Sequence, residues 1–344
     1  MPAQPRKSRA KRPSMYDVAR LAGVSQTTVS FVVNDAPNAN IPDETRERIW
    51  AAVRELGWRP NAMARALSLR QSDTIGFISD EIATSSHAGM IIQGAQDAAW
   101  AREKMLLVIN TGGARRLEER AFEMMLERQV EGLIYATMYH HAVELPPIES
   151  ETPLVLLDCF APGSSLPSVV PDEAQGARAA VEALLARGHR RIGFINNSDP
   201  IPARDGRLAG YTQALASAGI AYDPARVRAG HSTGPEGLRC AAELLDLPER
   251  PTALFCFSDV MAMGAYEAIK SRGLRIPDDV AVVGFDNLEV VAAHLYPPLS
   301  TIELPHYQMG EWAVNYLLGH ADVPLDGAPA QHRIPCRLVE RASA

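Results

Sequence analysis

The stretch MYDVARLAGVSQTTVSFVVN, residues 15–34, decides the fold of the N-terminal part of this 344-residue chain. A serine stands directly before each half, at Ser14 and Ser25, where a side-chain oxygen can cap the free amides at a helix start. Gly23 lies between the halves and can take the left-handed conformation that ends a helix. The stretch therefore predicts two short helices joined by a tight turn.

The second of these helices has an apolar side and a polar side. At 100° per residue, Val29, Val32 and Val33 fall together, which predicts that they pack inward. The other side offers amide, hydroxyl and aromatic groups to solvent, from Gln26, Thr27, Ser30 and Phe31. Amides can read adenine in a major groove and apolar groups can contact thymine methyls, so this side suits DNA. The alternative is an ordinary pair of helices that binds no DNA.

Charge along the chain favours a polyanionic partner for this end. Residues 1–72 hold twelve Lys or Arg and six Asp or Glu, a balance of +6. The remainder holds 22 Lys or Arg and 35 Asp or Glu, a balance of −13. A basic tail without function is the alternative. A third helix is expected from Pro42–Asp43 to Gly57, and Asn61 can cap a short fourth helix over residues 62–67.

From residue 74 onward, short apolar runs alternate with amphipathic helical stretches. The runs are Thr74–Ile78, Met105–Ile109, Gly132–Ala136, Leu154–Leu157, Ile192–Ile195, Leu254–Phe257 and Val280–Phe285. The helical stretches are Met90–Arg102, Leu117–Arg128, Ala174–Arg187, Leu208–Ala218, Leu238–Leu245 and Val260–Ser271. Continuous apolar strands separated by helices predict parallel sheets covered on both faces. The length allows two such sheets, with a seam near residues 168–176.

The body carries no motif of a common enzyme class. It lacks a Walker loop, G-x-G-x-x-G, G-x-S-x-G and H-E-x-x-H, so we expect no enzyme, cofactor or metal ion. The neighbouring His140 and His141 are expected at the surface rather than as metal ligands. Four widely spaced cysteines are expected to be buried, reduced thiols. No apolar run is long enough for a membrane span, and none follows the basic N-terminus as a secretory signal would require, so we expect a cytoplasmic protein.

Polar residues follow the expected strands, where open α/β sheets bind ligands. They are Ser79–Asp80, Thr137, Asp158, Asn196–Asn197, Ser258–Asp259 and Asp286–Asn287, and Arg207 is expected to open the helix after Asn196. So many polar groups around one cleft predict a hydrogen-bonding pocket. The alternative is helix capping, which we favour for Asp259.

The first 70 residues resemble the lactose-repressor family. Residues 15–34 resemble its helix-turn-helix, Thr45–Ile49 its third helix and Gly57–Leu67 its hinge helix. The resemblance implies that Gln26 and Thr27 read bases and that Leu67 wedges a central base step. The DNA-binding residues that it implies are Tyr16, Ser25, Gln26, Thr27, Thr28, Ser30, Phe31, Asn34, Asn61, Ala64 and Leu67. Phe31 stands where most members carry Arg; Arg reads guanine and Phe cannot, so the operator half-sites should differ there.

The resemblance continues to about residue 340, where the body looks like the two-lobed, periplasmic-binding-protein-like module of that family. Arg207 in RLAGY and Asp286 in VGFDN match the effector-binding arginine and aspartate. The implied effector-binding residues are Asp80, His87, Asp158, Arg207, His231, Ser258 and Asp286. Many members place an aromatic residue where this chain has Ser232, so either His231 substitutes or the effector is held without that stack.

These observations predict an N-terminal all-α helix-turn-helix domain plus hinge helix, followed by a two-lobed α/β domain with parallel sheets. The expected parts are a disordered basic arm (1–13), a helix-turn-helix domain (14–60), a hinge helix and linker (61–72) and an effector-binding and dimerisation domain (73–344). Its N-lobe is expected to hold about 73–172 and 300–330, and its C-lobe about 173–299 and 331–344. No leucine heptad follows Val339, so we expect no helical tetramerisation tail.

The expected function is that of a cytoplasmic transcriptional regulator, a repressor controlled by a small polar effector, a sugar or derivative. It is expected to bind a pseudo-palindromic operator in double-stranded DNA as a homodimer, because one helix-turn-helix makes few contacts. Two other classes stay open: a sugar-binding protein without a DNA function, and a doubly wound α/β enzyme. A salt-dependent DNA shift would exclude the first, and turnover screening would test the second.

Overall fold

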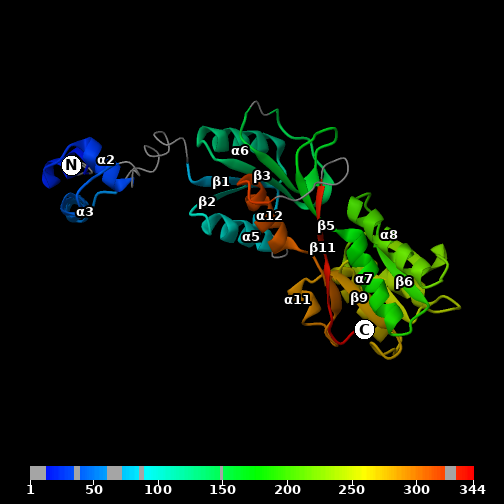
Figure 1. Ribbon diagram of the computed structural model, residues 1–344. Helices are drawn as coiled ribbons and strands as arrows, with labels where there is room; N and C mark the ends of the chain where they lie inside the picture. Colours follow the sequence, from blue (N-terminus) through cyan, green and yellow to red (C-terminus); the bar gives the residue numbers. More distant parts are fainter. Residues whose placement is uncertain (1–12, 35–38, 60–71, 85–88, 148–149, 322–330) are drawn as a thin grey trace, which may run out of the picture. The chain divides into compact units, whose positions relative to one another are not determined.

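The computed structural model of the chain describes residues 13–34, 39–59, 72–84, 89–147, 150–321 and 331–344 (Figure 1). The chain divides into two units, Met1–Asp73 and Thr74–Ala344, each described by itself below. The expected hinge helix with Asn61, Ala64 and Leu67 lies outside the described residues. So do His87 and residues 1–12 of the expected basic arm.

The N-terminal unit consists of α1 (Met15–Ala22), α2 (Gln26–Val33) and α3 (Asp43–Leu56). Ser14 begins α1 in a reciprocal capping box with Asp17, and the Ser25 side chain caps α2. Gly23 ends α1 in the left-handed conformation at φ 68°. Val29 and Val32 of α2 are buried in one core with residues of α1 and α3, and Val33 packs against it. The predicted helix pair is confirmed.

The first lobe of the second unit is a parallel sheet in the order β11-β5-β4-β3-β1-β2. Its strands are β1 (Thr74–Ser79), β2 (Met105–Asn110), β3 (Gly132–Ala142), β4 (Leu154–Phe160), β5 (Ser168–Asp172) and β11 (Gln331–Pro335). Helix α6 (Arg115–Glu127) covers one face, and α5 (Gly89–Trp100) with α12 (His306–Leu317) covers the other (Figure 1). A short 3-10 turn, η1 (Ile82–Thr84), follows β1.

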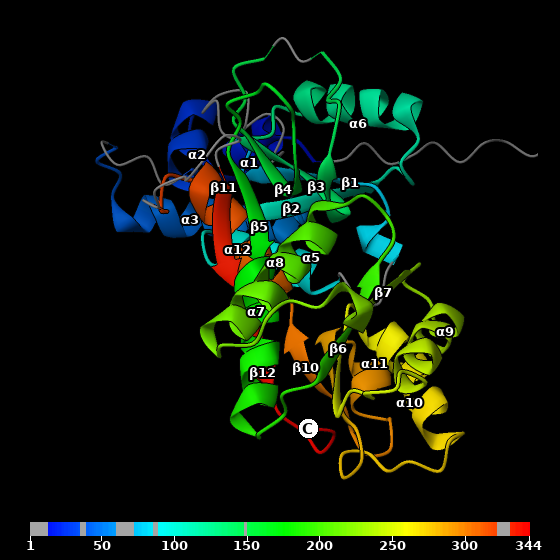
Figure 2. The ribbon, with the colours of Figure 1, turned by 90° about the vertical axis from the view of Figure 1, so that its right-hand side faces the viewer.

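The second lobe is a sheet in the order β12-β10-β9-β8-β6-β7, parallel except for β12. Its strands are β6 (Ile192–Asn197), β7 (Val227–Gly230), β8 (Ala253–Cys256), β9 (Ala281–Asp286), β10 (Ser300–Glu303) and β12 (Arg337–Val339). Helices α7 (Glu173–Ala186) and α8 (Pro202–Ser217) pack on one face, and α9 (Gly234–Leu245) and α10 (Asp259–Lys270) on the other (Figure 2). The short η2 (Pro224–Arg226) and α11 (Glu289–Ala292) complete it.

Helices α5 and α12 approach each other more closely than ordinary side chains allow. A Cβ atom at Gly94 would lie 2.0 Å from the carbonyl oxygen of Tyr307, and one at Gly310 would lie 2.0 Å from that of Ile91. Glycine at these two positions therefore lets the backbones touch. This contact fixes α12 on the first lobe, although its residues follow the second lobe in the chain.

The chain passes between the lobes three times in the described residues. It crosses from β5 into α7, from β10 into α12, and from β11 into β12. The expected lobe limits near residue 300 were therefore wrong in two places. Ser300–Glu303 pairs with β9 in the second lobe, and Gln331–Pro335 pairs with β5 in the first. Strands this short carry no sequence signal for the sheet that they join.

Candidate functional site

The outer side of α2 offers side chains to solvent where the sequence predicted. Gln26, Thr27 and Phe31 are exposed, Phe31 to 45%, and Ser30 is half-buried. Tyr16 on α1 is also exposed. This side of the unit therefore has donors, acceptors and one aromatic ring available to a groove.

Side chains at the two ends of α2 are held in place by local hydrogen bonds. Thr28 donates its backbone N–H to Ser25 Oγ at 3.1 Å, and the two hydroxyls lie 2.9 Å apart. At the other end, Asn34 Nδ2 donates to Ser30 Oγ at 3.1 Å. These bonds fix the ends of a helix of only eight residues and leave its outer side free to contact a ligand.

A cavity of about 370 Å³ opens between the two lobes of the second unit. Its walls come from the carboxyl ends of strands in both sheets and from α7 and α8. The lining residues are Met138, Tyr139, His140, Asp158, Pro171, Glu173, Asn197, Asp199, Ile201, Ala203, Arg207, Ser232, Phe257, Asp286 and Leu304. The predicted Asp158, Arg207 and Asp286 are thus brought together in one site of ordinary size for a small ligand.

Arg207 is the centre of the charged part of this cavity. Its Nε donates to Glu173 Oε2 at 2.7 Å, its Nη2 to Glu173 Oε1 at 3.3 Å, and its Nη1 to the carbonyl oxygen of Phe257. Burial disfavours the charge, but Glu173 and Asp286 outweigh it and raise the pKa of the Arg207 guanidinium. Three of its five N–H groups are thus committed to the protein.

The guanidinium of Arg207 lies over two aromatic rings. Its Cζ lies 3.6 Å from the ring centroid of Phe285 and 4.2 Å from that of Phe257. Arg207 lies in the second turn of α8, which begins at Pro202. The expectation that Arg207 opens the helix was therefore wrong, because Pro202 starts the helix earlier than the hydrophobic periodicity shows.

Asp158 ends up buried with an unsatisfied oxygen. Its side chain lines the cavity at the carboxyl end of β4, and its buried Oδ1 has no hydrogen-bond partner in the described part of the chain. Burial raises the pKa of this carboxyl well above its usual range; Glu173 adds to the effect and Arg207 opposes it. The backbone of Asp158 is held at φ 56°, an uncommon conformation that favours a functional role over a packing role.

Asp286 faces Arg207 from the end of β9. Its Oδ1 lies 3.6 Å from Arg207 Nη1, and its backbone is held at φ 107°. The nearby Asp259 has a different role, because Thr301 and the backbone of Leu288 both donate to its carboxylate, at 2.6 and 2.7 Å. Asp259 therefore joins α10 to neighbouring segments, while the capping predicted for it is done by Ser258.

Three other predicted residues lie behind the cavity wall rather than in it. Asp80 Oδ2 accepts from the backbone N–H of the lining residue Met138 at 3.0 Å. Ser258 Oγ lies 2.7 Å from Oγ of the lining residue Ser232. His231 is 70% exposed and contacts the lining residue Asp199 at 3.0 Å. Each of the three therefore reaches the cavity only through its neighbour.

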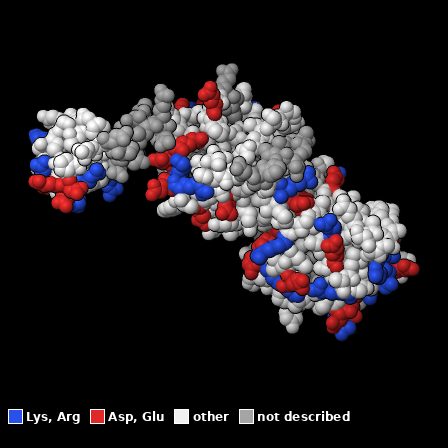
Figure 3. All heavy atoms as spheres, viewed as in Figure 1, with Lys and Arg blue, Asp and Glu red and all other residues white. Residues whose placement is uncertain are grey.

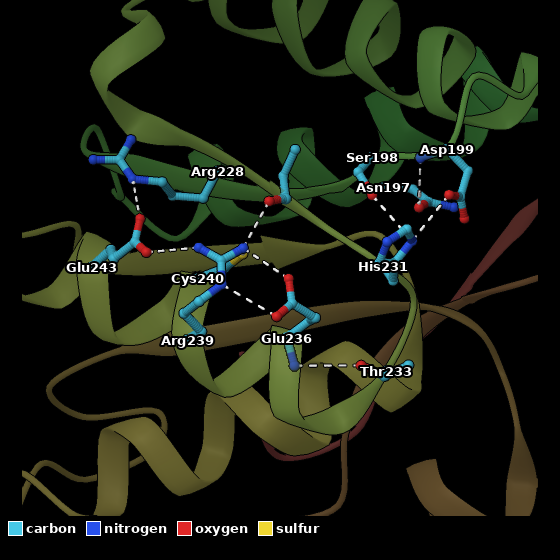
Figure 4. Close-up of polar contacts among 11 residues, drawn as sticks. Asn197, Ser198, Asp199, Arg228, His231, Thr233, Glu236, Arg239, Cys240 and Glu243 are labelled. Carbon is cyan, nitrogen blue, oxygen red and sulfur yellow. Dashed lines mark hydrogen bonds and ion pairs between the residues drawn. The ribbon is translucent and has the colours of Figure 1, made fainter.

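Figure 4 shows His231 beside Ser198 and Asp199, which follow β6. Its Nδ1 also lies 3.3 Å from Ser198 Oγ, so the ring is held on the surface side of the β6 loop. Arg239 pairs with Glu236 and Glu243 on neighbouring α9, a surface network separate from the cavity lining. His231 thus lies outside the cavity lining, where it is not placed to replace a stacking aromatic.

Sequence reasoning missed several lining residues, above all Glu173, Tyr139 and Phe257. Glu173 is the first residue of α7, and its partner lies 34 positions further along the chain, so no local spacing marks the pair. His140 was expected at the surface and is buried. Its ring meets the ring of Phe160 edge-on at 5.6 Å, because the strand continues past its expected end.

Comparison with known proteins assigns the chain to a family. Residues 14–61 match the family described as bacterial regulatory proteins, lacI family, and residues 181–344 match a periplasmic binding protein-like domain. The ribose operon repressor of Haemophilus influenzae is 36% identical over 309 residues, 89% of this chain and 91% of that protein. The chain belongs to the lacI family of bacterial regulatory proteins. The HTH-type transcriptional repressor CytR of Escherichia coli is 33% identical over 96% of this chain and 96% of that protein.

Solved lacI-family structures agree with this fold. A lac repressor dimer bound to operator and the anti-inducer ONPF has 29% identity and a TM-score of 0.75, over 97% of this chain and 99% of that one. A CelR–cellobiose complex has 27% identity and a TM-score of 0.62, over 97% and 100%. This lacI-family chain is therefore a DNA-binding transcriptional regulator. Within the described residues, no helix combines the length and apolarity needed to cross a membrane.

The surface of the body carries no field of a single sign on the side that Figure 3 shows. Basic and acidic side chains there lie beside one another. Ion pairs of the body include Arg275–Asp279 and Arg272–Asp246. Paired surface charges of this kind leave little net attraction for a polyanion. The body therefore contrasts with the basic first 72 residues.

Proposed function

We propose that this lacI-family protein is a cytoplasmic repressor that binds a pseudo-palindromic operator as a homodimer and is controlled by an uncharged sugar in the cavity. The observation that carries the proposal is the buried Asp158 Oδ1, which lacks a partner among the described residues and lies in the cavity wall. A carboxyl oxygen accepts hydrogen bonds, and a sugar hydroxyl can donate one. A bound hydroxyl would supply the hydrogen bond that this oxygen lacks.

The charges of the lining support an uncharged effector. Arg207 is the only Lys or Arg in the described lining, and its charge is already balanced by Glu173 and Asp286. Asp199 adds a further carboxylate. Burial lowers the pKa of His140 to about 4, so its ring is neutral at pH 7. The site therefore repels a phosphate or carboxylate group and favours neutral hydroxyl donors.

The DNA-binding role is supported by the outer side of α2 and by the +6 balance of residues 1–72. A single short helix reads few bases, whereas two copies related by a two-fold axis read two half-sites. The solved lac repressor is a dimer on its operator, and it matches 97% of this chain. Catalysis is not part of the proposal, because in the described lining Ser232 is bonded to Ser258 rather than to a base.

A ligand screen tests the effector class. The melting temperature of the full chain is measured with neutral aldoses, led by D-ribose and D-glucose, and with their phosphate esters at equal concentration. We expect a neutral aldose at about 100 times its Kd to add about 2.7 kcal/mol of stability. Asp158→Ala should lose most of that increase, while Asp205→Asn, at an exposed carboxylate outside the lining, should keep it. Stabilisation by the phosphate esters but not by the aldoses would refute the proposal.

A DNA experiment tests the other half. An operator selected from a random library is titrated with the protein at several salt concentrations, and log affinity should fall by about 0.9 per phosphate contact for each unit of log salt. The effector found in the screen should change this affinity. Affinity that is flat in salt would contradict the DNA role, and turnover of the aldose would favour the enzyme alternative.

A further inference from the structure

Strand β3 carries extra residues where it reaches the cavity. Ala136 pairs with Leu157 of β4 and His141 pairs with Cys159, so β3 advances by five residues while β4 advances by two. Bulges of this kind re-aim side chains next to functional sites. Here the bulge turns the ring of Tyr139 outward, where it is 52% exposed and lines the cavity.

The backbone of this bulge is fixed on three sides. Met138 donates its N–H to Asp80 at 3.0 Å. The Tyr139 carbonyl oxygen lies 3.1 Å from the Thr137 hydroxyl and 2.7 Å from His141 Nδ1. A carbonyl only accepts, so the proton of the His141 ring sits on Nδ1. Tyr139 therefore starts from a rigid backbone position, which lowers the entropy that its ring loses on contact with a ligand.

The ring of Tyr139 packs beside one neighbouring ring and is otherwise largely exposed. Its centroid lies 4.7 Å from that of His141 with a tilt of 35°. The other aromatic rings in the described lining are already covered. Phe257 lies under the Arg207 guanidinium at 4.2 Å, and buried His140 meets Phe160 edge-on. Tyr139 is thus the aromatic residue of that lining whose ring stays accessible to a ligand.

We infer that Tyr139 is a specificity-determining residue, the platform on which the ring of the effector stacks. This inference rests on the proposed function and narrows its ligand class to closed-ring sugars. A closed sugar ring has a face of C–H groups that can pack on an aromatic ring, whereas an open-chain polyol with similar hydroxyls has no such fixed face. The carboxyl and amide groups of the cavity recognise hydroxyls, and Tyr139 recognises the ring.

The test compares a sugar with its own alditol on the full chain by titration calorimetry. The pair is the aldose with the largest effect in the screen and its reduced form, D-glucose with D-glucitol or D-ribose with ribitol. Tyr139→Ala should weaken sugar binding by about three- to tenfold and leave alditol binding within about twofold. Tyr139→Phe keeps the ring and should bind the sugar like the parent. Tyr222→Ala removes an exposed tyrosine remote from the lining and is the matched control.

Each outcome has a distinct meaning. Sugar selectivity that disappears in Tyr139→Ala and returns in Tyr139→Phe supports the inference. A parent that binds a sugar, with Tyr139→Ala binding it equally well, overturns the inference and leaves the proposed function intact. Equal weakening of sugar and alditol also overturns it, because Tyr139 then only shapes the cavity. A parent that binds none of the aldoses refutes the proposed function itself.

Discussion

Glu173→Gln breaks the buried pair at the centre of the cavity while keeping the shape of the side chain. The parent Glu173 accepts two hydrogen bonds from Arg207, at 2.7 and 3.3 Å, and both side chains are more than nine-tenths buried. Breaking a buried pair costs about 3–5 kcal/mol, because the remaining charge is left without its partner. Gln keeps one acceptor, and Asp286 stays 3.6 Å from Arg207, so we expect a loss of about 2–3 kcal/mol.

The assay is calorimetric melting of the full chain, with the transition of the larger unit followed separately. For a unit of this size, the expected loss lowers Tm by about 4–5 °C. Glu182→Gln on the same helix is the matched control. Its partner Arg178 lies 3.7 Å away and both side chains are about half exposed, so the variant should lose less than about 0.5 kcal/mol.

A second readout follows from the same substitution. With Glu173 neutral, the Arg207 charge is no longer fully balanced, so the affinity for a sugar phosphate should rise relative to that for the parent sugar. Equal Tm values for Glu173→Gln and Glu182→Gln would refute the reasoning, because the buried pair would then count no more than a surface pair. Unchanged ligand preference would refute the charge argument alone.

Four further predictions concern single side chains. Phe31→Arg should favour guanine at one symmetric pair of operator positions, by about 1–3 kcal/mol per bidentate contact, and identical base preferences from a randomised operator selection would exclude Phe31 as a base reader. Leu67→Ser should keep the parent Tm and weaken operator binding; an equally strong, equally bent complex in a gel-shift bending assay would contradict this. Burial raises the pKa of Asp158 above its value in the unfolded chain, so the parent should lose stability as pH rises above about 4, where the unfolded chain ionises. The Tm of Asp158→Asn should therefore rise relative to that of the parent from there upward, and parallel curves of Tm against pH would contradict this. Burial lowers the pKa of His140 to about 4, so stability should fall as pH drops from about 6.5 towards 4 in the parent, and less so in His140→Gln when both are melted across that range.

The helix-turn-helix was predictable in detail because its signals are local. Ser14, Gly23 and Ser25 fix the ends of α1 and α2 within a few bonds of themselves, and the valine spacing fixes the inner side of α2. Seven strands of the body were predictable for a similar reason, since each is a short apolar run. The short strands β7, β10, β11 and β12 were not predicted, because they carry no such run. Strand and helix limits then follow to within a few residues.

The cavity was only half predictable. Asp158, Arg207 and Asp286 follow strands or open a recognisable stretch, so the sequence places them near the ends of the sheets. The Glu173–Arg207 pair and the bulge that exposes Tyr139 depend on how distant segments meet. His140 was misjudged for the same reason, because burial of a strand end is decided by Gln331 and Phe160, which lie elsewhere in the chain.

The three passages of the chain between lobes have a consequence for synthesis on the ribosome. The first lobe has its sheet up to β5 once residue 172 has emerged, but Met309, Trp312 and Val314 of its core and its edge strand β11 come later. At about 5–20 residues per second, the 163 residues from 173 to 335 take roughly 10–30 s to translate. During that interval β5 is an unpaired sheet edge and the face awaiting α12 is bare. A nascent chain halted near residue 200 should therefore bind chaperones and be cleaved readily by proteases. A full-length chain held on the ribosome by a long C-terminal linker should bind no chaperone and resist cleavage.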